Sequence, residues 1–563
     1  MALLANLLCA AAAHGASVPA LRGTGGAVVS DDPLATAVGI AVLRRGGNAV
    51  DAAVATALAL AVTYPEAGNL GGGGFALVRR GAEVASLDFR EVAPAAARRD
   101  MFLDEGGEPV PGASEVGPLA AGVPGSPAGL WELHRRFGSL PWPEVVEPAR
   151  RLAADGFPVS PALARVLAQH RELLGRFPES ARVWLPGGEP PAVGSTLRLP
   201  DLAATLDGYA RRGPTAVTEG PVARAVEEVS RRHGGVLTAA DLAAYRPVWR
   251  PPVRYEAFGW TFASLDLPSS GGIVLGETLG ILERLGWAAL PRFGAGRWHL
   301  LAEAWRAAYA DRTLLADPET TAATAADLLA PAWMDARARA IRLDRAAESR
   351  AVAPWAPAAG PPEAADTTHV SVVDGAGDAV ALTTTINDLF GSGLWVPGAG
   401  FFLNDEMDDF TTAPGRPNLY GLVQGQANAV APGRRMLSSL TPTLAWRGGD
   451  GGDDLLVAGG RGGPRIPTNV GQVLLHVVVD GDELQAAIDR PRLHHQWLPD
   501  ELRAEADALA PETRSALEAL GHRFGEGPVV ARVHVLRRRP DGTLEAARES
   551  RAPAAAAVVS PAP

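Results

Sequence analysis

A threonine near the middle of the chain is the residue whose setting first suggests chemistry. Thr367 follows a segment rich in proline and alanine, residues 351–363, and begins an apolar run typical of a β-strand. A threonine hydroxyl is a weak nucleophile unless a base lies beside it. A cut before Thr367 would free its α-amine, whose reference pKa of about 7.7–8.0 suits that base. The alternative is a loop that simply enters a strand.

Two groups farther along the chain could serve such a nucleophile. Gly462 and Gly463 follow the apolar run 455–458, and two backbone N–H groups there could stabilise an oxyanion. Residues 404–410 read Asn-Asp-Glu-Met-Asp-Asp-Phe, which is either a solvated acidic loop or a site for an ammonium group. Because a glycine pair is also a common turn, neither group decides the chemistry alone.

Carboxylate binding has candidates of its own. Ser438 and Ser439 precede a Leu-Thr-Pro sequence, where they could cap a turn or hold a carboxylate. Arg90 follows Leu-Asp-Phe and could clamp a carboxylate through two parallel hydrogen bonds, or form a surface ion pair. Each of the three residues therefore keeps an ordinary structural alternative.

Composition and charge exclude several classes of function. The chain has no lysine, which excludes Schiff-base chemistry, a phosphate-loop lysine and a lysine general base. Cys9 is the only cysteine, so an intrachain disulfide and a cysteine-ligated zinc site are excluded. His494 and His495 have no third ligand at helical spacing, and no metal is predicted. The net charge of −11 argues against nucleic-acid binding.

The elements that must position these residues mix helices with strands. The 563 residues are 47% hydrophobic and 20% charged, as in an ordinary globular protein with a large core. Helices are predicted over 33–45, 51–62, 300–315, 466–477 and 483–489, within and around a mainly helical region from 126 to 340. Hairpins are predicted over 75–89, 370–385, 443–458 and 529–548, and a tight turn at the four glycines 71–74. This mixture favours an α+β layered fold.

The start of the chain has some features of a secretory leader. Residues 1–21 contain no Asp, Glu or Arg, and their apolar stretch, 2–13, has the length of a signal core. The usual positive residues before that core are missing, so an alanine-rich tail is the alternative. The stretch is too short to span a bilayer, and no later segment is predicted to do so. We expect a periplasmic or secreted protein, with a cytoplasmic location as the alternative.

Taken together, these pieces resemble the γ-glutamyltransferase (γ-glutamyltranspeptidase) family of N-terminal nucleophile hydrolases. The resemblance extends from about Gly26 to the last hairpin. Its motifs in the first part of the chain lie at 46–53, 68–75, 88–91 and 268–272. Its motifs in the last part lie at 367–369, 383–387, 404–410, 437–439 and 462–463. Each motif is weak alone, but their number and order make the resemblance specific.

The resemblance implies a fold and a maturation step. The fold is a four-layer αββα sandwich of the N-terminal nucleophile hydrolase type. The precursor would cleave itself between Asp366 and Thr367, giving a large subunit, 21–366, and a small subunit, 367–563, after a possible leader at 1–20. The two subunits stay together. The family needs no metal or organic cofactor, so the expected partners are small molecules and the two subunits of one precursor, with no nucleic acid and no membrane span.

The resemblance also implies the chemistry of the small subunit. Thr367 would attack the γ-amide of a γ-glutamyl compound such as glutathione. Water, or the amine of an amino acid or peptide, would then resolve the γ-glutamyl ester. Gly462 and Gly463 would hold the oxyanion, and Thr385 would keep Thr367 aligned.

Recognition of the acyl donor is implied in the same way. The α-carboxylate would be bound by Arg90, Ser438 and Ser439, and the α-ammonium group by Asn387, Glu406 and Asp409. The segment 414–421, with Tyr420, resembles the lid loop of many bacterial members. One arginine for the anion and two carboxylates for the cation make electrostatic sense.

Two other functions remain open on this scaffold. One is a related acylase that acts on glutaryl or cephalosporin-type amides. A glutaryl group lacks the α-ammonium group, so the carboxylates of Glu406 and Asp409 would be left unmatched, which favours a glutamyl donor. The other is an unprocessed, non-catalytic binding homologue, which the presence of all the expected catalytic groups disfavours.

Overall fold

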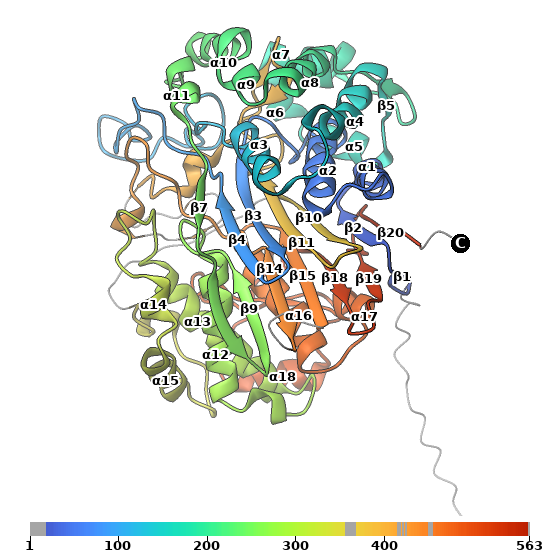
Figure 1. Cartoon of the computed structure of the whole chain (residues 1–563). Helices are drawn as coiled ribbons and strands as arrows, with labels where there is room; N and C mark the ends of the chain where they lie inside the picture. The colour runs from blue at the N-terminus through green and yellow to red at the C-terminus, as the bar shows by residue number, and fades with distance from the viewer. Residues whose placement is uncertain are drawn as a thin grey trace, which may run out of the picture.

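Two seven-stranded sheets lie face to face in the centre of the molecule, and helices cover both outer faces (Figure 1). The structure is a computed structural model that describes residues 18–354, 367–413, 418, 421–422, 425–448 and 454–560. Every pairing within the two sheets is antiparallel. The expected four-layer αββα sandwich is confirmed.

The strands of the two sheets come from both ends of the chain. The first sheet has the order β20 (Ala555–Val558), β2 (Gly26–Ser30), β10 (Thr367–Asp374), β11 (Ala379–Thr385), β3 (Gly73–Arg80), β4 (Glu83–Asp88), β7 (Val248–Arg250). The second has the order β1 (Leu21–Gly23), β19 (Leu544–Ala547), β18 (Arg532–Arg538), β15 (Asp454–Arg461), β14 (Thr443–Arg447), β9 (Trp260–Ser264), β8 (Val253–Ala257). Short two-stranded pairs are β5 (Phe157–Pro158) with β6 (Thr196–Leu197), β12 (Trp395–Val396) with β13 (Phe401–Phe402), and β16 (Leu493–His494) with β17 (Arg503–Ala504).

The helices divide between the two outer layers along the chain (Figure 1). On the side of the first sheet lie α1 (Pro33–Arg44), α2 (Ala49–Thr63), α3 (Ser126–Phe137), α4 (Trp142–Asp155), α5 (Pro161–Gln169), α6 (Arg171–Gly175), α7 (Pro178–Trp184), α8 (Pro200–Arg212), α9 (Thr215–Thr218), α10 (Gly220–Arg232) and α11 (Ala239–Ala244). On the side of the second lie α12 (Gly271–Arg284), α13 (Ala295–Arg312), α14 (Ala325–Leu328), α15 (Pro331–Ala340), α16 (Arg465–Val478), α17 (Leu484–Asp489) and α18 (Pro511–Ala519).

Helix α2 shows why the sequence selects these layers. All of its residues are buried, because it lies between β10 and β11 on one side and α1 and α4 on the other. Small alanines on every side allow this close contact. Its start is fixed by a capping box, in which the Asn48 side chain accepts from the backbone of Asp51 and the Asp51 carboxylate accepts from the backbone of Asn48. The helix therefore begins two residues before the predicted start.

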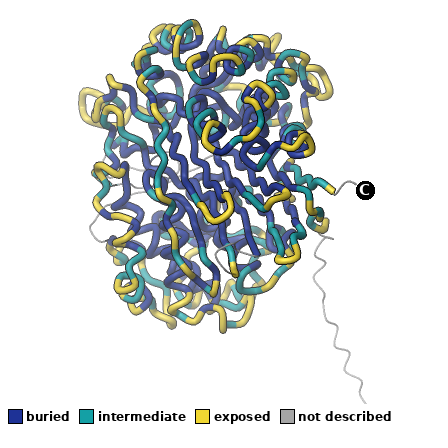
Figure 2. The backbone as a smooth tube through the Cα atoms, viewed as in Figure 1, coloured by how far each residue is buried: buried dark blue, intermediate teal, exposed yellow. Residues whose placement is uncertain are grey.

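The contact between the two sheets is buried and made largely of small and branched apolar side chains. Its buried residues include Ala27, Val29, Leu77, Val373, Ala381, Leu444, Leu455 and Val457. Figure 2 shows the central strands buried along most of their length, with exposed positions mostly on the outer helices, the loops and the edge strands. Among the described residues, no helix is long and apolar enough to cross a membrane.

Several strands differ from the sequence prediction. The region expected to be mainly helical contains β8 and β9, which form one edge of the second sheet. The glycines at 71–74 are only partly a turn, because β3 already begins at Gly73. Their smallness serves close packing: a Cβ on Gly72 would lie 2.0 Å from the carbonyl oxygen of Thr385. The four hairpins are confirmed, with ends shifted by a few residues.

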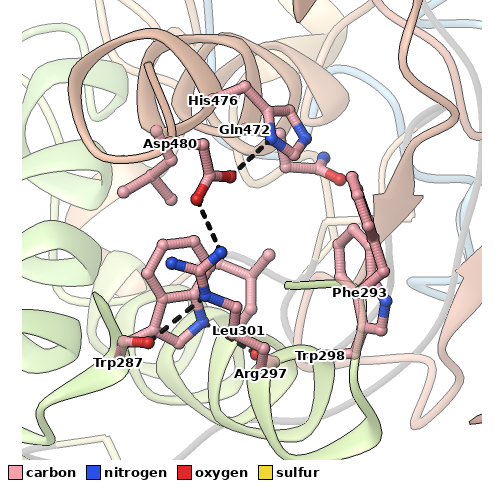
Figure 3. A pocket seen from close by; sticks show the side chains of 9 residues that line it. Trp287, Phe293, Arg297, Trp298, Leu301, Gln472, His476 and Asp480 are labelled. Atoms are coloured by element: carbon pink, nitrogen blue, oxygen red, sulfur yellow. Dashed lines mark hydrogen bonds and ion pairs between the residues drawn. The ribbon is translucent and has the colours of Figure 1, made fainter. Parts of the chain in front are cut away.

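A small pocket lined with aromatic rings lies at the N-terminal end of helix α13 (Figure 3). The guanidinium of Arg297 lies 4.0 Å from the centre of the Trp287 ring and contacts Asp480 at 2.7 Å. His476 contacts the second oxygen of that carboxylate at 3.0 Å. These contacts join α13 to the end of α16, so the direction of α13 across the second sheet is fixed.

Candidate functional site

Thr367 is the first residue of β10 and lies at the open end of a hairpin. Its register partner on β11 is Thr385. Thr367 Oγ donates to Thr385 Oγ at 3.4 Å, and Thr385 Oγ also accepts the backbone N–H of Asn387 at 2.9 Å. Thr367 is only 3% exposed. The hairpin therefore fixes the hydroxyl of Thr367 next to a second hydroxyl.

Two contacts between β10 and β15 indicate how Thr367 lies relative to the glycine pair. Ser371 Oγ donates to the carbonyl of Val457 at 3.4 Å. Two residues earlier on the same face, the His369 ring packs on Gly459, where an added Cβ would lie 2.2 Å from the imidazole. Continuing this alignment by two residues on each strand brings Thr367 level with the end of β15, directly before Gly462.

The backbone at the glycine pair is suited to an oxyanion site. Gly462 has φ +136° and Gly463 has φ +55°, both in the region that favours glycine. A Cβ on Gly462 would lie 2.9 Å from the Cα of Ala531. Within the described part of the chain, neither N–H donates a hydrogen bond, so both remain available to an anion.

The other face of the β10 start is held by buried polar groups. Thr368 Oγ donates to Asp31 at 2.9 Å, and this carboxylate lies 3.4 Å from His534. Arg461 and Arg532 both donate to the hydroxyl of Tyr64, the second at 2.8 Å. The start of β10 is therefore held through Thr368, while the end of β15 and the start of β18 are held on Tyr64.

Arg90 lies two residues after the end of β4 and is surrounded by acids. It contacts Glu406 at 2.5 Å and also Asp409, and its Nε donates to the carbonyl of Met436 at 3.3 Å. The two acids belong to a 3-10 turn, η4 (Glu406–Asp409). The structure thus brings together the groups predicted for the α-carboxylate and those predicted for the α-ammonium, and pairs them with one another.

Burial shifts the pKa values in this cluster. The pKa of Glu406 is raised to about 7, because burial outweighs the attraction of Arg90. The pKa of Asp409 is also raised by burial, against the opposing effects of Arg90 and Arg312. For Arg90 itself, burial alone would lower the pKa, but Glu406 and Asp409 outweigh it and the pKa is raised. Arg90 therefore stays a cation, while Glu406 can change its charge near neutral pH.

Asn387 ties the hairpin to the acidic turn. It adopts φ +74°, which is uncommon for a residue other than glycine. Its amide nitrogen donates to the carbonyl of Asp405 at 3.0 Å, and the carboxylate of Asp405 accepts the backbone N–H of Asp388 at 2.9 Å. Asn387 thus lies beside both Thr385 and η4.

The serine pair contacts residues that precede Thr367 in the sequence. The backbone N–H of Ser438 donates to the carbonyl of Pro268 at 2.8 Å, and the carbonyl of Ser438 accepts from the Ser270 backbone at 2.9 Å. Ser439 Oγ accepts from Arg312 at 3.1 Å. Sequence reasoning missed Arg312, since an arginine at the end of an amphipathic helix is commonplace and carries no signal of its own.

Four residues named from the sequence remain to be accounted for. Asp366 and Tyr420 lie outside the described residues. His494 and His495 are buried and engaged in the protein: His494 contacts Thr468 at 2.9 Å and Gln496 at 2.8 Å.

Comparison with known proteins assigns the chain to a family. The family model for gamma-glutamyltranspeptidase matches residues 35–559. The chain belongs to this γ-glutamyltranspeptidase family. The glutathione hydrolase proenzyme of Escherichia coli (strain K12) is 41% identical over 534 residues, covering 94% of this chain and 91% of that protein. The family resemblance drawn from the motifs is confirmed.

Acylases occur among the relatives of this family member. The Acylase ACY 1 proenzyme of Pseudomonas sp. (strain V22) is 35% identical over 535 residues, covering 93% of this chain and 92% of that protein. The crystal structure of cephalosporin acylase from Bacillus halodurans matches with a TM-score of 0.84 and 25% identity over 98% of both chains. The fold therefore serves both kinds of protein, and the residues of the site must decide between them.

Proposed function

We propose that this member of the γ-glutamyltranspeptidase family is a self-processing γ-glutamyl transferase and hydrolase acting on glutathione and related compounds. One observation carries the proposal: a buried set of opposite charges, Arg90 with Glu406 and Asp409, is joined to the end of the Thr367 hairpin by the hydrogen bond from Asn387 to Asp405. An α-amino acid has both a carboxylate and an ammonium group, so it brings a partner for each charge.

Maturation is the first reaction of Thr367. Its Oγ attacks the carbonyl carbon of Asp366, the peptide nitrogen of Thr367 leaves as the α-amine, and an ester forms. Water then hydrolyses this ester. The products are a large subunit, 21–366, and a small subunit, 367–563, that begins with the nucleophile and its own base.

The catalytic cycle uses the same groups. Thr367 Oγ attacks the γ-amide carbon of the donor while the Thr367 α-amine takes its proton. The N–H groups of Gly462 and Gly463 stabilise the oxyanion, and the proton passes to the leaving amine. Water or an acceptor amine then attacks the γ-glutamyl ester and releases Thr367. The Thr385 hydroxyl oxygen, which accepts a hydrogen bond from Thr367 Oγ, keeps the nucleophile in place.

Donor recognition divides by charge. Arg90, Ser438 and Ser439 bind the α-carboxylate, and Asn387, Glu406 and Asp409 bind the α-ammonium group. Because the pKa of Glu406 is raised to about 7, its carboxyl group can be protonated in the empty site. An incoming ammonium group would then favour the ionised form. Tyr420 is proposed as part of a lid. Export to the periplasm or medium is proposed from the leader-like start of the sequence alone.

A second candidate is an acylase for glutaryl or cephalosporin-type amides, which the acylase relatives support. A glutaryl donor carries the carboxylate without the ammonium group, and would leave Glu406 and Asp409 with only Arg90 to balance them. Two buried carboxylates that share a single arginine would weaken the binding of a glutaryl donor. The glutamyl donor is therefore preferred.

The two candidates are separated by two chromogenic substrates. The purified enzyme is given γ-glutamyl-p-nitroanilide and glutaryl-p-nitroanilide, with and without a dipeptide acceptor. We expect a kcat/KM higher by about tenfold or more for the γ-glutamyl compound, because one charged interaction distinguishes the two. A preference for the glutaryl compound would establish the acylase instead. Thr367→Ala serves as the inactive control.

A further inference from the structure

Arg312 is a buried cation that contacts no carboxylate among the described residues. It is the last residue of α13 and is 2% exposed. Three comparably buried arginines do have a carboxylate partner: Arg90 with Glu406 at 2.5 Å, Arg306 with Glu303 at 3.1 Å, and Arg492 with Glu549 at 3.0 Å. Asp409 is near enough to oppose the effect of burial on the pKa of Arg312, but it makes no ion pair with it. An anion in direct contact with the buried guanidinium would therefore add stabilisation.

Arg312 fixes the direction of the hydroxyl groups around it. Its Nε donates to Ser270 Oγ at 2.8 Å, and its Nη2 donates to Ser439 Oγ at 3.1 Å. A guanidinium has no acceptor, so each serine oxygen must accept in these bonds. The hydroxyl of Ser270 then donates to the carbonyl of Ser438 at 2.7 Å. No bond within the described residues uses the hydroxyl hydrogen of Ser439.

The hydroxyl oxygen of Ser438 also acts as a hydrogen-bond acceptor. Its Oγ accepts the backbone N–H of Leu440 at 3.1 Å, which leaves its hydroxyl hydrogen to donate elsewhere. Ser439 thus offers a hydroxyl donor in direct contact with a buried positive charge, and the adjacent Ser438 offers a second one. This arrangement favours a carboxylate and disfavours an ammonium group.

We propose that Arg312 is a specificity-determining positioning residue, which acts through Ser439 to select acyl donors that carry an α-carboxylate. The inference rests on the proposed function, because it concerns the same donor site. It explains how two neutral serines can prefer an anion. It also supplies a cation at the serines other than Arg90, which is paired with Glu406 and Asp409.

Three p-nitroanilides that differ by one charged group test this role. The γ-glutamyl compound carries both groups, the glutaryl compound carries only the carboxylate, and the 4-aminobutanoyl compound carries only the ammonium group. Arg312→Gln should lower kcat/KM for the two carboxylate donors by about 10- to 100-fold, mainly through KM. It should leave the 4-aminobutanoyl compound unchanged. If a truncated anilide is not cleaved, the Ki of glutarate or 4-aminobutanoate as competitive inhibitor replaces its kcat/KM.

A second arginine on the same helix provides the matched control. Arg297→Gln removes the ion pair at the other end of α13, so it should lower stability without changing the ratio between the three donors. Asp409→Asn should show the reverse pattern, weakening the two ammonium donors and sparing the glutaryl compound. If Arg312→Gln does not fold, Arg312→Lys takes its place, since lysine keeps the charge but lacks the fork that reaches both serines.

The outcomes separate the inference from the function on which it rests. An equal loss for all three donors in the Arg312 variant would show a merely structural residue and would overturn the inference, while the wild-type activity would stand. A wild-type enzyme that is processed but does not hydrolyse the γ-glutamyl compound would overturn the proposed function, and the inference with it.

Discussion

At the scale of the residue, the charge on Glu406 is the most adjustable feature of the site. Burial raises its pKa to about 7, although Arg90 opposes the shift. Between its ordinary pKa of 4.5 and about 7, folded Glu406 keeps a proton that the unfolded chain has released. Its contribution to the free energy of unfolding therefore falls as pH rises through that window. The same ionisation prepares the site for an ammonium group.

Glu406→Gln should therefore change the pH dependence of donor binding. In the wild type, kcat/KM for a γ-glutamyl donor should rise as pH increases through about 7, because ionised Glu406 attracts the donor's ammonium group. The variant should lose this component and be about tenfold or more slower on the alkaline side. Steady-state kinetics from about pH 5 to about pH 9 measure both effects.

The control for this profile is Glu228→Gln, which changes an exposed carboxylate on α10 and should keep the wild-type profile. An unaltered rise in Glu406→Gln would assign the ionisation to another group, such as the α-amine of Thr367.

At the scale of the element, the contact between β10 and β15 sets the geometry of the nucleophile. His369 packs against Gly459 with no room for a side chain between them. Burial lowers the pKa of His369 to about 3, so it is a neutral packing group that contacts Thr383 and Ser371. The distance between the two strands therefore depends on a glycine.

Gly459→Ala should disturb the packing of β10 on β15 and slow self-cleavage. The new Cβ would lie 2.2 Å from the His369 ring, so this buried ring must shift, and β10 with it if the ring has no other room. We expect about 1–3 kcal/mol of destabilisation and an accumulation of uncut chain. Gly175→Ala, at a helical position with open space around it, is the control and should be processed normally. Normal processing and stability in Gly459→Ala would contradict the proposed alignment.

The sequence predicted elements with local signals better than elements that depend on partners. Helix α1 has an Asp32 cap and a proline start, and it begins at Pro33 as predicted. The hairpins were predicted because their turns are local. Strand β20 at the far end was not, because only its pairing with β2 makes Ala555–Val558 a strand. Arg312 was missed for the same reason: its importance comes from Ser439, which is distant in sequence.

At the scale of the whole molecule, the two proposed subunits are interleaved in both sheets. In the first sheet, β10 and β11 of the small half lie between β2 and β3 of the large half. In the second, four strands of the small half lie between β1 and β9 of the large half. Neither half can keep its sheets without the other, so cleavage before Thr367 leaves a single folding unit.

The cleaved enzyme should therefore behave as one body. We expect the two fragments to elute together in size-exclusion chromatography without denaturant. They should also unfold in one transition, seen alike by fluorescence and circular dichroism. Separation of the fragments under native conditions, or two resolved transitions, would contradict the interleaved architecture.

The most direct test of the account is the intact mass of the denatured, purified protein. Self-processing predicts two fragments, the smaller corresponding to residues 367–563, and predicts one uncut chain for Thr367→Ala. Cleavage at any other position, or cleavage before residue 367 in the Thr367→Ala variant, would contradict the assignment of Thr367 as the nucleophile.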